Sequence, residues 1–440
     1  MHDMKHGVLS FFLLAILFIF PNVKNQTAPS DLPTKYDWRE QGYDFPVLDQ
    51  GGCQAGYAFA AVGAVQAAIW KNEGVKVDFS ENHAIECNWH VQNDYFGSPK
   101  HCDGGNFRIL ANLFTQEGLA LESCDPYIGV SNQCNRMCKA QYRIKEWYEF
   151  SPAYQIPAPE IIKNLILDYG PLYTQMDPAI SGFSTYSGNH VLYNYSGSDP
   201  DKYTHGVLIV GWNDRLNYPG GKGAWIVRNS YGTDWGMGGY FYIAYGTAGI
   251  GSSLSTVTNW EEVDIFTKVH FYDEAGRTSQ IGIGGVDFLQ GSTMALFQIS
   301  TYEIAQGVEF WTTDAALVNV QIYEYFDGSQ PKNLLFEAMD VSFPFAGYHH
   351  IPIPKQVNIT GPKEIAVVVS IQNVSQFFPI AVDHLGIKST GKTWFLNSES
   401  NWQPLSSSTG FNYDATIRLR SLKIPDEFDR RNFLPLIVKN

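Results

Sequence analysis

The sequence contains no cysteine after Cys138, few charged residues and no hydrophobic run long enough to span a membrane. Charged residues make up 17% of the chain, and the formal net charge is −14. This negative balance argues against nucleic acid or an anionic membrane as a main partner. The apolar run from Val8 to Phe20 is shorter than the roughly 20 residues of a spanning helix. It follows Lys5 and His6, so we expect residues 1–25 to be a secretory signal and no membrane contact beyond it.

Cysteine is missing from most of the chain, because all six residues lie between Cys53 and Cys138. An even number in an exported protein predicts disulfides within one domain rather than a metal site. The nearby His83, His90 and His101 form no Cys-x2-Cys or His-x3-His pair of the kind that zinc sites contain. We therefore expect no metal and no cofactor. The expected location is secreted or extracellular, or the lumen of an endolysosome or vacuole.

The length and the apolar content predict a globular protein of more than one domain. A chain of 440 residues exceeds one ordinary domain, and its apolar fraction of 44% suffices for large cores. Four Asn-x-Ser/Thr sequons predict a glycoprotein if the source is eukaryotic. They are at Asn25, Asn194, Asn358 and Asn373.

The stretch around which the chain is organised is a glycine-containing loop followed by an apolar helix of small residues. The loop starts at Gln50, and the helix is expected to begin at position 56 and to run to Trp70. The first turn of a helix has backbone N–H groups without intrahelical partners and the positive end of the helix dipole. Such a place can lower the pKa of a thiol or bind an anion.

This stretch resembles the active-site loop of papain-like cysteine proteases (peptidase C1), which reads Gln-Gly-x-Cys-Gly-x-Cys-Trp-Ala-Phe. Aligned through Gln50, Cys53 and Phe59, the family's nucleophilic cysteine falls on Gly56. Gln54 and Tyr57 also replace the usual glycine and tryptophan. The resemblance begins at residues 32–39 and continues, through matching segments, to about residue 244. Because glycine has no side chain, it implies a family member without its nucleophile.

The resemblance implies roles for several other residues. His205 matches the catalytic histidine, Asn229 the asparagine that orients it, and Gln50 the donor of the oxyanion hole. Tyr231 stands where a tryptophan usually shields the histidine–asparagine hydrogen bond, and Trp235 matches an aromatic residue near the site. Besides these two aromatic residues, the expected contacts to a bound substrate or ligand are Gly104, Gly105 and Phe107.

The resemblance also implies three disulfides, although spacing alone leaves fifteen connectivities open. The implied pairs are Cys53–Cys102, Cys87–Cys134 and Cys124–Cys138. Ser80, which lies between Cys53 and Cys87 in the sequence, is expected to cap a second helix that runs to Cys87.

The part of the chain after residue 244 predicts a second, all-β domain. Residues 246–253 are rich in Gly and Ser and predict a linker. About nine strand candidates follow between Val269 and Leu422, separated by turn residues. One alternates Val318, Val320 and Ile322 with polar residues. The pattern predicts a β-sandwich.

The expected fold is therefore α+β. A papain-like two-lobe domain, with a helical left lobe and a β half-barrel right lobe, is expected at 32–250. An all-β sandwich is expected at 265–424, with a tail at 425–440. The sandwich resembles the lectin-like (jelly-roll) domains attached to some papain-like proteases.

Two groups of side chains in the β domain bear on ligand binding. His349 and His350 are neighbours in one expected strand, so they point to opposite faces and do not share a metal. Six aromatic residues are candidates for stacking on sugars or for the core. They are Phe310, Trp311, Tyr323, Tyr325, Trp394 and Trp402.

The hypothesis is a secreted pseudoprotease that binds a peptide or protein in its cleft without cleaving it, and whose β domain attaches to a partner or glycan. One alternative is an active cysteine-type endopeptidase, with Cys53 as nucleophile or with His205 activating a water. Another is a structural or adhesive surface protein, in which Gln50, His205 and Asn229 persist only because they hold the two lobes together.

Overall fold

The structure is a computed structural model that describes residues 32–93, 102–152, 155–193, 199–282, 289–386, 390–406 and 412–425. The expected signal segment, two of the sequons, His101 and nearly all of the expected tail lie outside these residues. No helix among the described residues is long and apolar enough to cross a membrane.

The left lobe is built on one buried helix, as the sequence predicts. Helix α1 begins at Gly56, and its residues are buried from Gly56 to Ile69. Small alanine and glycine side chains allow neighbouring elements to approach it from all sides. It ends at Gly74, whose φ of 71° is a left-handed conformation that glycine adopts without strain. The helices of this lobe are α1 (Gly56–Glu73), α2 (Glu81–Cys87), α3 (Trp89–Gln92) and α4 (Phe107–Gln116).

Side-chain caps explain where two of these helices begin. The Ser80 hydroxyl accepts a hydrogen bond from the His83 N–H, at 2.8 Å, which confirms the predicted start of α2. The Asn106 side chain accepts in the same way from the Ile109 N–H, at 3.1 Å, at the start of α4. Helix α4 was not predicted from the sequence.

The right lobe is a twisted sheet with one covering helix, α5 (Pro159–Tyr169). Its strands are β1 (Lys35–Asp37), β2 (Tyr142–Glu149), β3 (Leu172–Met176), β4 (Val191–Leu192), β5 (His205–Tyr218), β6 (Gly221–Arg228), β7 (Tyr240–Ala244) and β8 (Ser252–Glu262). They pair in the order β4-β7-β6-β5-β3-β8-β2, and β1 pairs with β5. The expected helical lobe and half-barrel lobe are confirmed.

The prediction of a linker at residues 246–253 is wrong, because this segment is ordered and buried. It forms a short 3-10 helix at Thr247–Gly249 and then the first residues of β8. Ala248 and Ile250 are fully buried, and β8 pairs with both β3 and β2. Burial of this segment against the sheet outweighs the flexibility that its glycine and serine content suggests.

The second domain is a β-sandwich, as predicted. One layer contains β15 (Ala346–Thr360), β12 (Tyr302–Thr312), β21 (Ile417–Lys423) and β9 (Thr267–His270). The other contains β14 (Pro331–Phe343), β13 (Ala316–Phe326), β16 (Lys363–Asn373), β11 (Gln290–Ile299), β18 (Thr393–Leu396) and β19 (Trp402–Pro404). A small sheet contains β10 (Ser279–Ile281), β17 (Ile380–Asp383) and β20 (Asp414–Ala415).

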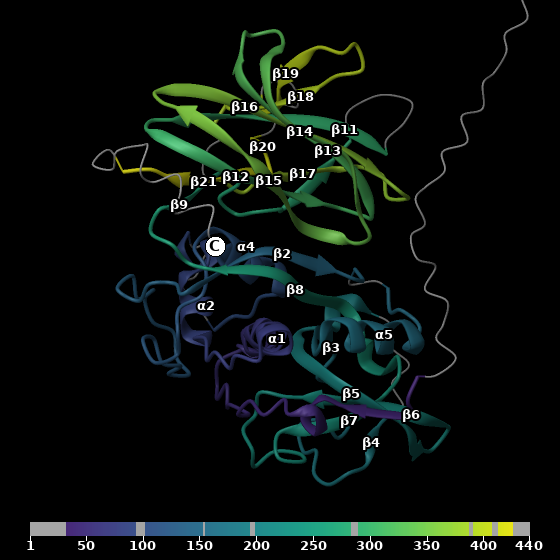
Figure 1. Ribbon diagram of the computed structural model, residues 1–440. Coiled ribbons are helices and arrows are strands. Elements are labelled where there is room, and N and C mark those ends of the chain that lie inside the picture. Colours follow the sequence, from purple (N-terminus) through teal and green to yellow (C-terminus); the bar gives the residue numbers. More distant parts are fainter. Residues whose placement is uncertain are drawn as a thin grey trace, which may run out of the picture. The chain divides into compact units, whose positions relative to one another are not determined.

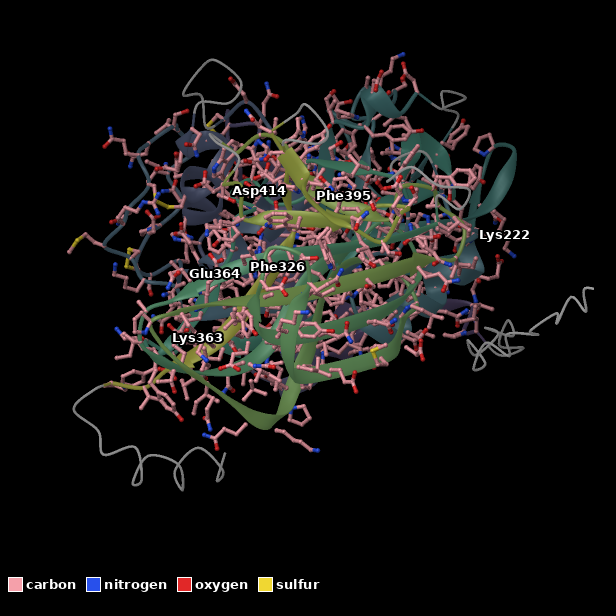
Figure 2. All side chains as sticks on the ribbon, turned by 90° about the horizontal axis from the view of Figure 1, so that it is seen from above. Lys222, Phe326, Lys363, Glu364, Phe395 and Asp414 are labelled. Atoms are coloured by element: carbon pink, nitrogen blue, oxygen red, sulfur yellow. A yellow bond between two sulfur atoms is a disulfide. The ribbon has the colours of Figure 1, made fainter. Side chains whose placement is uncertain are left out.

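Side chains between the two layers form a core of their own. Val318, Val320 and Ile322 are fully buried in it, while Asn319 and Gln321 are not, which confirms the predicted alternation. Figure 2 looks onto the six-stranded layer, with Phe326 and Phe395 among the labelled residues.

The two domains share one sheet. Strand β15 pairs with β2 over Ala346–Tyr348, so the order β8-β2-β15-β12 runs from one domain into the other. Figure 1 shows β2 and β8 next to the layer that contains β15 and β12. Gly347 has a φ of 147°, and a Cβ there would lie 2.2 Å from the Trp147 carbonyl oxygen. Only glycine allows this close approach.

A buried arginine of the second domain, which forms an ion pair there, also bonds to helix α4. Arg418 donates to the Asp273 carboxylate, with Nη2 at 2.6 Å, and both side chains have 0% exposure. The same guanidinium donates to Asn112 Oδ1 at 2.7 Å and Thr115 Oγ1 at 2.8 Å, both on α4. The domains are therefore joined by backbone pairing and by polar contacts.

The other expectations about the second domain have mixed outcomes. His350 contacts Glu309, whereas His349 bonds Thr312 Oγ1 and packs on Phe343, so the two histidines face apart as predicted.

Asn373 is 3% exposed, and its amide donates within the domain, so the folded chain does not present this sequon.

The six aromatic residues that were candidates for sugar stacking fall into two groups. Phe310 and Trp311 are each 1% exposed and belong to the cores. The remaining side chains, Tyr323, Tyr325, Trp394 and Trp402, are partly or well exposed.

Candidate active site and cleft

His205 is held against the start of α1 by the close approach of two backbones. It is the first residue of β5, and the next residue is Gly206. A Cβ at position 206 would lie 2.6 Å from Tyr57 Cα and 3.2 Å from the Gly56 carbonyl carbon. Glycine at 206 therefore lets β5 lie directly on the first turn of α1. The sequence pair His205-Gly206 brings the imidazole to that helix N-terminus.

The imidazole is fixed by Asn229, as the resemblance implied. His205 Nε2 lies 2.8 Å from Asn229 Oδ1, and the two residues are 6% and 4% exposed. Because the carbonyl oxygen accepts, the proton is on Nε2, and Nδ1 is the nitrogen turned toward Gly56. Burial lowers the pKa of His205, and the hydrogen bond to Asn229 opposes that effect. The histidine is therefore neutral at pH 7.

The space that a side chain at position 56 would occupy is filled by this ring. A Cβ built on Gly56 would lie 2.7 Å from both His205 Cε1 and Nδ1, and 3.1 Å from Gln50 Oε1. Carbon atoms in real proteins do not approach this closely without a shift of the neighbour. The arrangement places the imidazole directly on a glycine backbone, and any side chain at 56 requires the ring to move.

Gln50 lies at the same place, but both ends of its amide have partners inside the protein. Its Nε2 donates to the Cys53 carbonyl at 2.7 Å, and its Oε1 accepts from the Ser230 hydroxyl at 2.6 Å. One proton of the amide nitrogen thus remains for a ligand oxygen. The residue expected at the oxyanion hole is near Gly56 and is 7% exposed.

Aromatic side chains cover the His205–Asn229 pair. The Tyr231 ring lies 5.2 Å from the His205 ring at an angle of 35°, and the Phe183 ring lies 5.6 Å away. Trp235 packs edge-on against Tyr231, with 5.5 Å between ring centroids. Tyr231 therefore packs on His205, at the position where the resemblance implied an aromatic residue that shields the histidine–asparagine hydrogen bond. Trp235 packs on Tyr231. Phe183 was missed because it stands in an irregular segment with no distinguishing motif.

The three disulfides join the pairs that the resemblance implied: Cys53–Cys102, Cys87–Cys134 and Cys124–Cys138. The first one ties the loop before α1 to the glycine-rich segment that follows Cys102. The Gln54 N–H also donates to the Cys102 carbonyl, at 3.1 Å. Gly104 has a φ of 99°, and a Cβ at Gly105 would lie 2.5 Å from the Tyr57 ring. Both glycines are therefore required by the local geometry.

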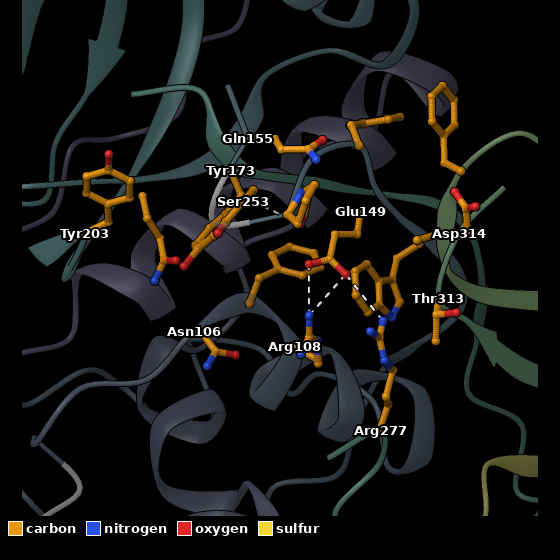
Figure 3. A pocket seen from close by; sticks show the side chains of 18 of the residues that line it. Asn106, Arg108, Glu149, Gln155, Tyr173, Tyr203, Ser253, Arg277, Thr313 and Asp314 are labelled. Carbon is orange, nitrogen blue, oxygen red and sulfur yellow. Dashed lines mark hydrogen bonds and ion pairs between the residues drawn. The ribbon is translucent and has the colours of Figure 1, made fainter. Parts of the chain in front are cut away.

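A cavity of about 960 Å³ opens beside these glycines, and both domains line it. The first domain contributes residues that include Gln54, Gly104, Gly105, Asn106, Phe107, Tyr173, Tyr203, Thr204 and Ser253. The second domain contributes residues that include Arg277, Gln280, Thr313, Asp314, Phe345, Ser375 and Gln376. Thr204, which lines the cavity, immediately precedes His205 in the chain. Figure 3 shows several of these side chains, with Tyr203 and Asp314 on opposite sides.

Three charged residues that line this cavity and contact one another were missed by the sequence analysis. Glu149 on β2 contacts Arg108 on α4 and Arg277, which follows β9. The three positions are far apart in the sequence and belong to no motif, so only the fold brings them together. Of the expected ligand contacts, Gly104, Gly105 and Phe107 line the cavity, whereas Tyr231 and Trp235 do not.

Metal binding has no support among the residues that the structure describes. They contain no group of three or more His, Cys, Asp or Glu side chains that could hold an ion. His83 is 5% exposed at the start of α2, and burial lowers its pKa.

Comparison with known families agrees with this architecture. Residues 32–258 match the family model described as papain family cysteine protease, and residues 269–414 match the one described as lectin like domain. The cathepsin L-like proteinase of Fasciola hepatica is 32% identical over 215 residues, which cover 48% of this chain and 60% of the relative. Cathepsin L2 of Homo sapiens is 30% identical over 219 residues, covering 49% and 61%. The chain thus spans about three fifths of these relatives.

Two solved structures share the arrangement of both domains. The clostridial cysteine protease Cwp84 after propeptide cleavage has a TM-score of 0.72 at 18% identity, covering 89% of this chain and 99% of that one. A structure of the cysteine protease and lectin-like domains of Cwp84, a surface layer associated protein of Clostridium difficile, has the same score and identity and covers 89% of each chain. At this identity the likeness concerns the fold. With its papain-like domain matched over half its length, this chain belongs to the papain family of cysteine proteases, and a lectin-like domain follows.

Proposed function

We propose that this chain is an exported pseudoprotease, whose cleft binds an extended peptide or protein segment without cleaving it. The observation that carries the proposal is the contact between Gly56 and His205. Gly56, which faces Nδ1 of the histidine, has no side chain. A Cβ at this position would lie only 2.7 Å from two atoms of the imidazole. Without a nucleophile at this point, the acyl-enzyme route is closed.

No other thiol replaces the missing one. All six cysteines of the chain form disulfides and none is free. Cys53, the nearest cysteine to the site, is bonded to Cys102 and is 3% exposed. A thiolate is the attacking species in this chemistry, and a disulfide sulfur supplies none. This argues against the alternative of an active cysteine peptidase.

A water activated by His205 is also disfavoured by the geometry. A water between Gly56 and the ring would occupy the place of the absent side chain, where a carbon would already be 2.7 Å from two ring atoms. A water needs room for its own volume and two or more polar partners. Polar partners are present, since His205 Nδ1 and Gln50 Oε1 lie 2.7 and 3.1 Å from that place, but His205 Cε1 at 2.7 Å leaves too little room for a water.

The cleft beside this site retains features that suit an extended ligand. Gly104 and Gly105 leave backbone groups open to pairing with an incoming strand, which is a common mode of peptide recognition. The adjoining cavity of about 960 Å³ is within the range of natural ligand sites. Three disulfides support export to an oxidising compartment.

Two assays on the full chain test the proposal. We expect no hydrolysis of mixed fluorogenic peptides, with or without reductant, and measurable binding of members of a fluorescent peptide library by anisotropy. Hydrolysis by the wild type would overturn the proposal. So would a folded protein that binds no peptide.

The alternative of an adhesive surface protein, with a β domain that binds carbohydrate, makes a different prediction. In that case a peptide that occupies the cleft would leave attachment to a surface or glycan unchanged. Under the present proposal such a peptide competes with the natural partner. A competition assay with a peptide selected from the library therefore separates the two functions.

A further inference from the structure

We propose that Arg108 and Arg277 form an anion subsite in the cavity between the two domains, which selects ligands that carry an acidic side chain. The inference rests on the proposed peptide-binding function and names the class of ligand for that cleft. The carboxylate of a bound aspartate or glutamate would pair with the two guanidinium groups. The subsite would make the second domain a determinant of specificity, because Arg277 belongs to it.

The two arginines share a single carboxylate. Arg108 Nη2 donates to both oxygens of Glu149, at 2.9 and 3.2 Å. Arg277 Nη1 lies 3.6 Å from Glu149 Oε2, an ion pair that is longer than a hydrogen bond. Figure 3 shows both guanidinium groups reaching the Glu149 carboxylate from different elements. Glu149 is thus bound fully by one arginine and only loosely by the other.

The local charge is therefore unbalanced at a place with little water. Arg277 and Glu149 are 12% and 13% exposed and therefore only weakly hydrated, whereas Arg108 is 40% exposed. Two guanidinium groups against one carboxylate leave an excess of one positive charge. The pKa of Arg277 is lowered to about 10, by burial and by the charge of Arg108. An additional anion would relieve the repulsion between the two cations.

Donor groups remain for that anion. Arg277 Nη2 donates to Gln280 Oε1 at 2.8 Å, and Nη1 makes a long contact of 3.5 Å to the Thr312 carbonyl. A guanidinium has five N–H donors in a fork that fits a carboxylate. Arg108 Nε is buried without a hydrogen-bond partner. Both arginines thus have unused hydrogen-bonding capacity.

Other carboxylates on the cavity wall do not neutralise the pair. Asp314 accepts hydrogen bonds from the Ala315, Ser375 and Gln376 backbone N–H groups and from the Ser375 hydroxyl. Neither oxygen of Asp314 forms an ion pair with the two arginines, and Asp103 is exposed at the rim. The excess positive charge is therefore available to a ligand.

The walls of the cavity suit the stem of an acidic side chain on a peptide. Gly104 and Gly105, at one side, can hold a peptide backbone. Apolar side chains of Phe107, Trp147 and Tyr173 also line the cavity. A side chain that leaves the backbone at the glycines would cross this apolar surface and end at the charged pair. The side chain of glutamate or aspartate, with a short apolar stem and a terminal carboxylate, suits this path from the glycines over apolar side chains to the arginines.

The test is binding of matched octapeptides to the full chain. The probes are fluorescein-labelled octapeptides that differ only by glutamate or glutamine at one position, scanned over all positions and measured by anisotropy. We expect glutamate at one position to bind about 10- to 100-fold more tightly than glutamine, which is the usual range for a buried charge-assisted hydrogen bond. Arg277→Gln should abolish this preference.

Two further variants complete the design. Arg108→Gln changes a side chain that is 40% exposed, so it tolerates substitution, and should reduce the preference. Lys222→Gln removes one positive charge from an exposed position on the β5–β6 hairpin and should keep the preference. Figure 2 shows Lys222 at the edge of the molecule.

The outcomes separate the two proposals. Peptides that bind equally with glutamate and glutamine would overturn the anion subsite and leave the peptide-binding cleft intact. A preference that survives both arginine substitutions would also overturn it. If no octapeptide binds to the folded wild type, the proposed function fails and the subsite fails with it.

Discussion

At the scale of single residues, the site depends on a contact between a glycine and a histidine. Gly56 and Gly206 both lack the side chain that would separate β5 from α1, and His205 lies in the space that results. The hydrogen bond from His205 to Asn229 nevertheless persists. The hydrogen bond that orients the histidine is thus present, while position 56 carries no side chain.

Gly56→Cys tests whether only the nucleophile is missing. The new Cβ must push the His205 ring by several tenths of an ångström, since it would start 2.7 Å away. We expect hydrolysis of fluorogenic peptides to rise at least about 100-fold over the wild type, because a lost nucleophile can cost on the order of 10⁶ in kcat. Gly56→Ala is the matched control, since it adds the same Cβ without a thiol, and should remain inactive. A Gly56→Cys variant that iodoacetamide labels but that cleaves nothing would show a site changed beyond its nucleophile.

At the scale of elements, the start of α2 contains a buried acid whose charge is unfavourable. Glu81 is 2% exposed, and its Oε2 has no hydrogen-bond partner. Burial, followed by the nearby Glu122 carboxyl, raises the pKa of Glu81 to about 8 from the ordinary value of 4.5. The folded protein thus holds a proton that the unfolded chain releases.

Because this pKa is raised, the contribution of Glu81 to stability is lost as pH rises from about 4.5 to about 8. Glu81→Gln does not titrate and removes that loss. We expect the free energy of unfolding of the variant, relative to the wild type, to increase through this window by a few kcal/mol. Urea titrations at a series of pH values between 4 and 9 measure the difference. Parallel pH curves for the two proteins would contradict the expectation.

Local patterns in the sequence were sufficient for elements with local causes. The start of α1 and the Ser80 cap follow from the residues beside them, and the alternation around Val318 predicted its strand. The start of strand β8 was predicted to be a linker, because its glycine and serine residues are stabilised only by contacts with distant strands. The cluster of Arg108, Glu149 and Arg277 could not be predicted for the same reason, because only contacts between distant segments bring it together. Resemblance, rather than spacing, selected the three disulfide pairs.

At the scale of the whole molecule, the two domains should unfold together, because a shared sheet and the hydrogen bonds of the buried Arg418 to helix α4 connect them. Replacing Arg418 by Met leaves the Asp273 carboxylate buried and removes bonds to Asn112 and Thr115. Loss of one partner of a buried pair costs about 3–5 kcal/mol. We expect chemical denaturation to show this loss in one transition by tryptophan fluorescence and by circular dichroism.

A matched control is Arg136→Met, which breaks an ion pair with Glu117 whose side chains are 57% and 51% exposed. That substitution should change stability by less than about 0.5 kcal/mol, since exposed pairs contribute little. Two separate transitions in the Arg418 variant, one of them unshifted, would show that the domains are energetically independent.

The shared sheet also has a consequence for synthesis of the protein. Strand β2 is made early, but the partner at its outer edge, Ala346–Tyr348, is made only after about half of the second domain. During synthesis, the edge of β2 in the first domain therefore stays unpaired until β15 is made. An unpaired strand edge can pair wrongly with other chains. Release of a chain truncated near residue 264 would leave that edge permanently open. Production of the first domain alone should thus yield aggregates.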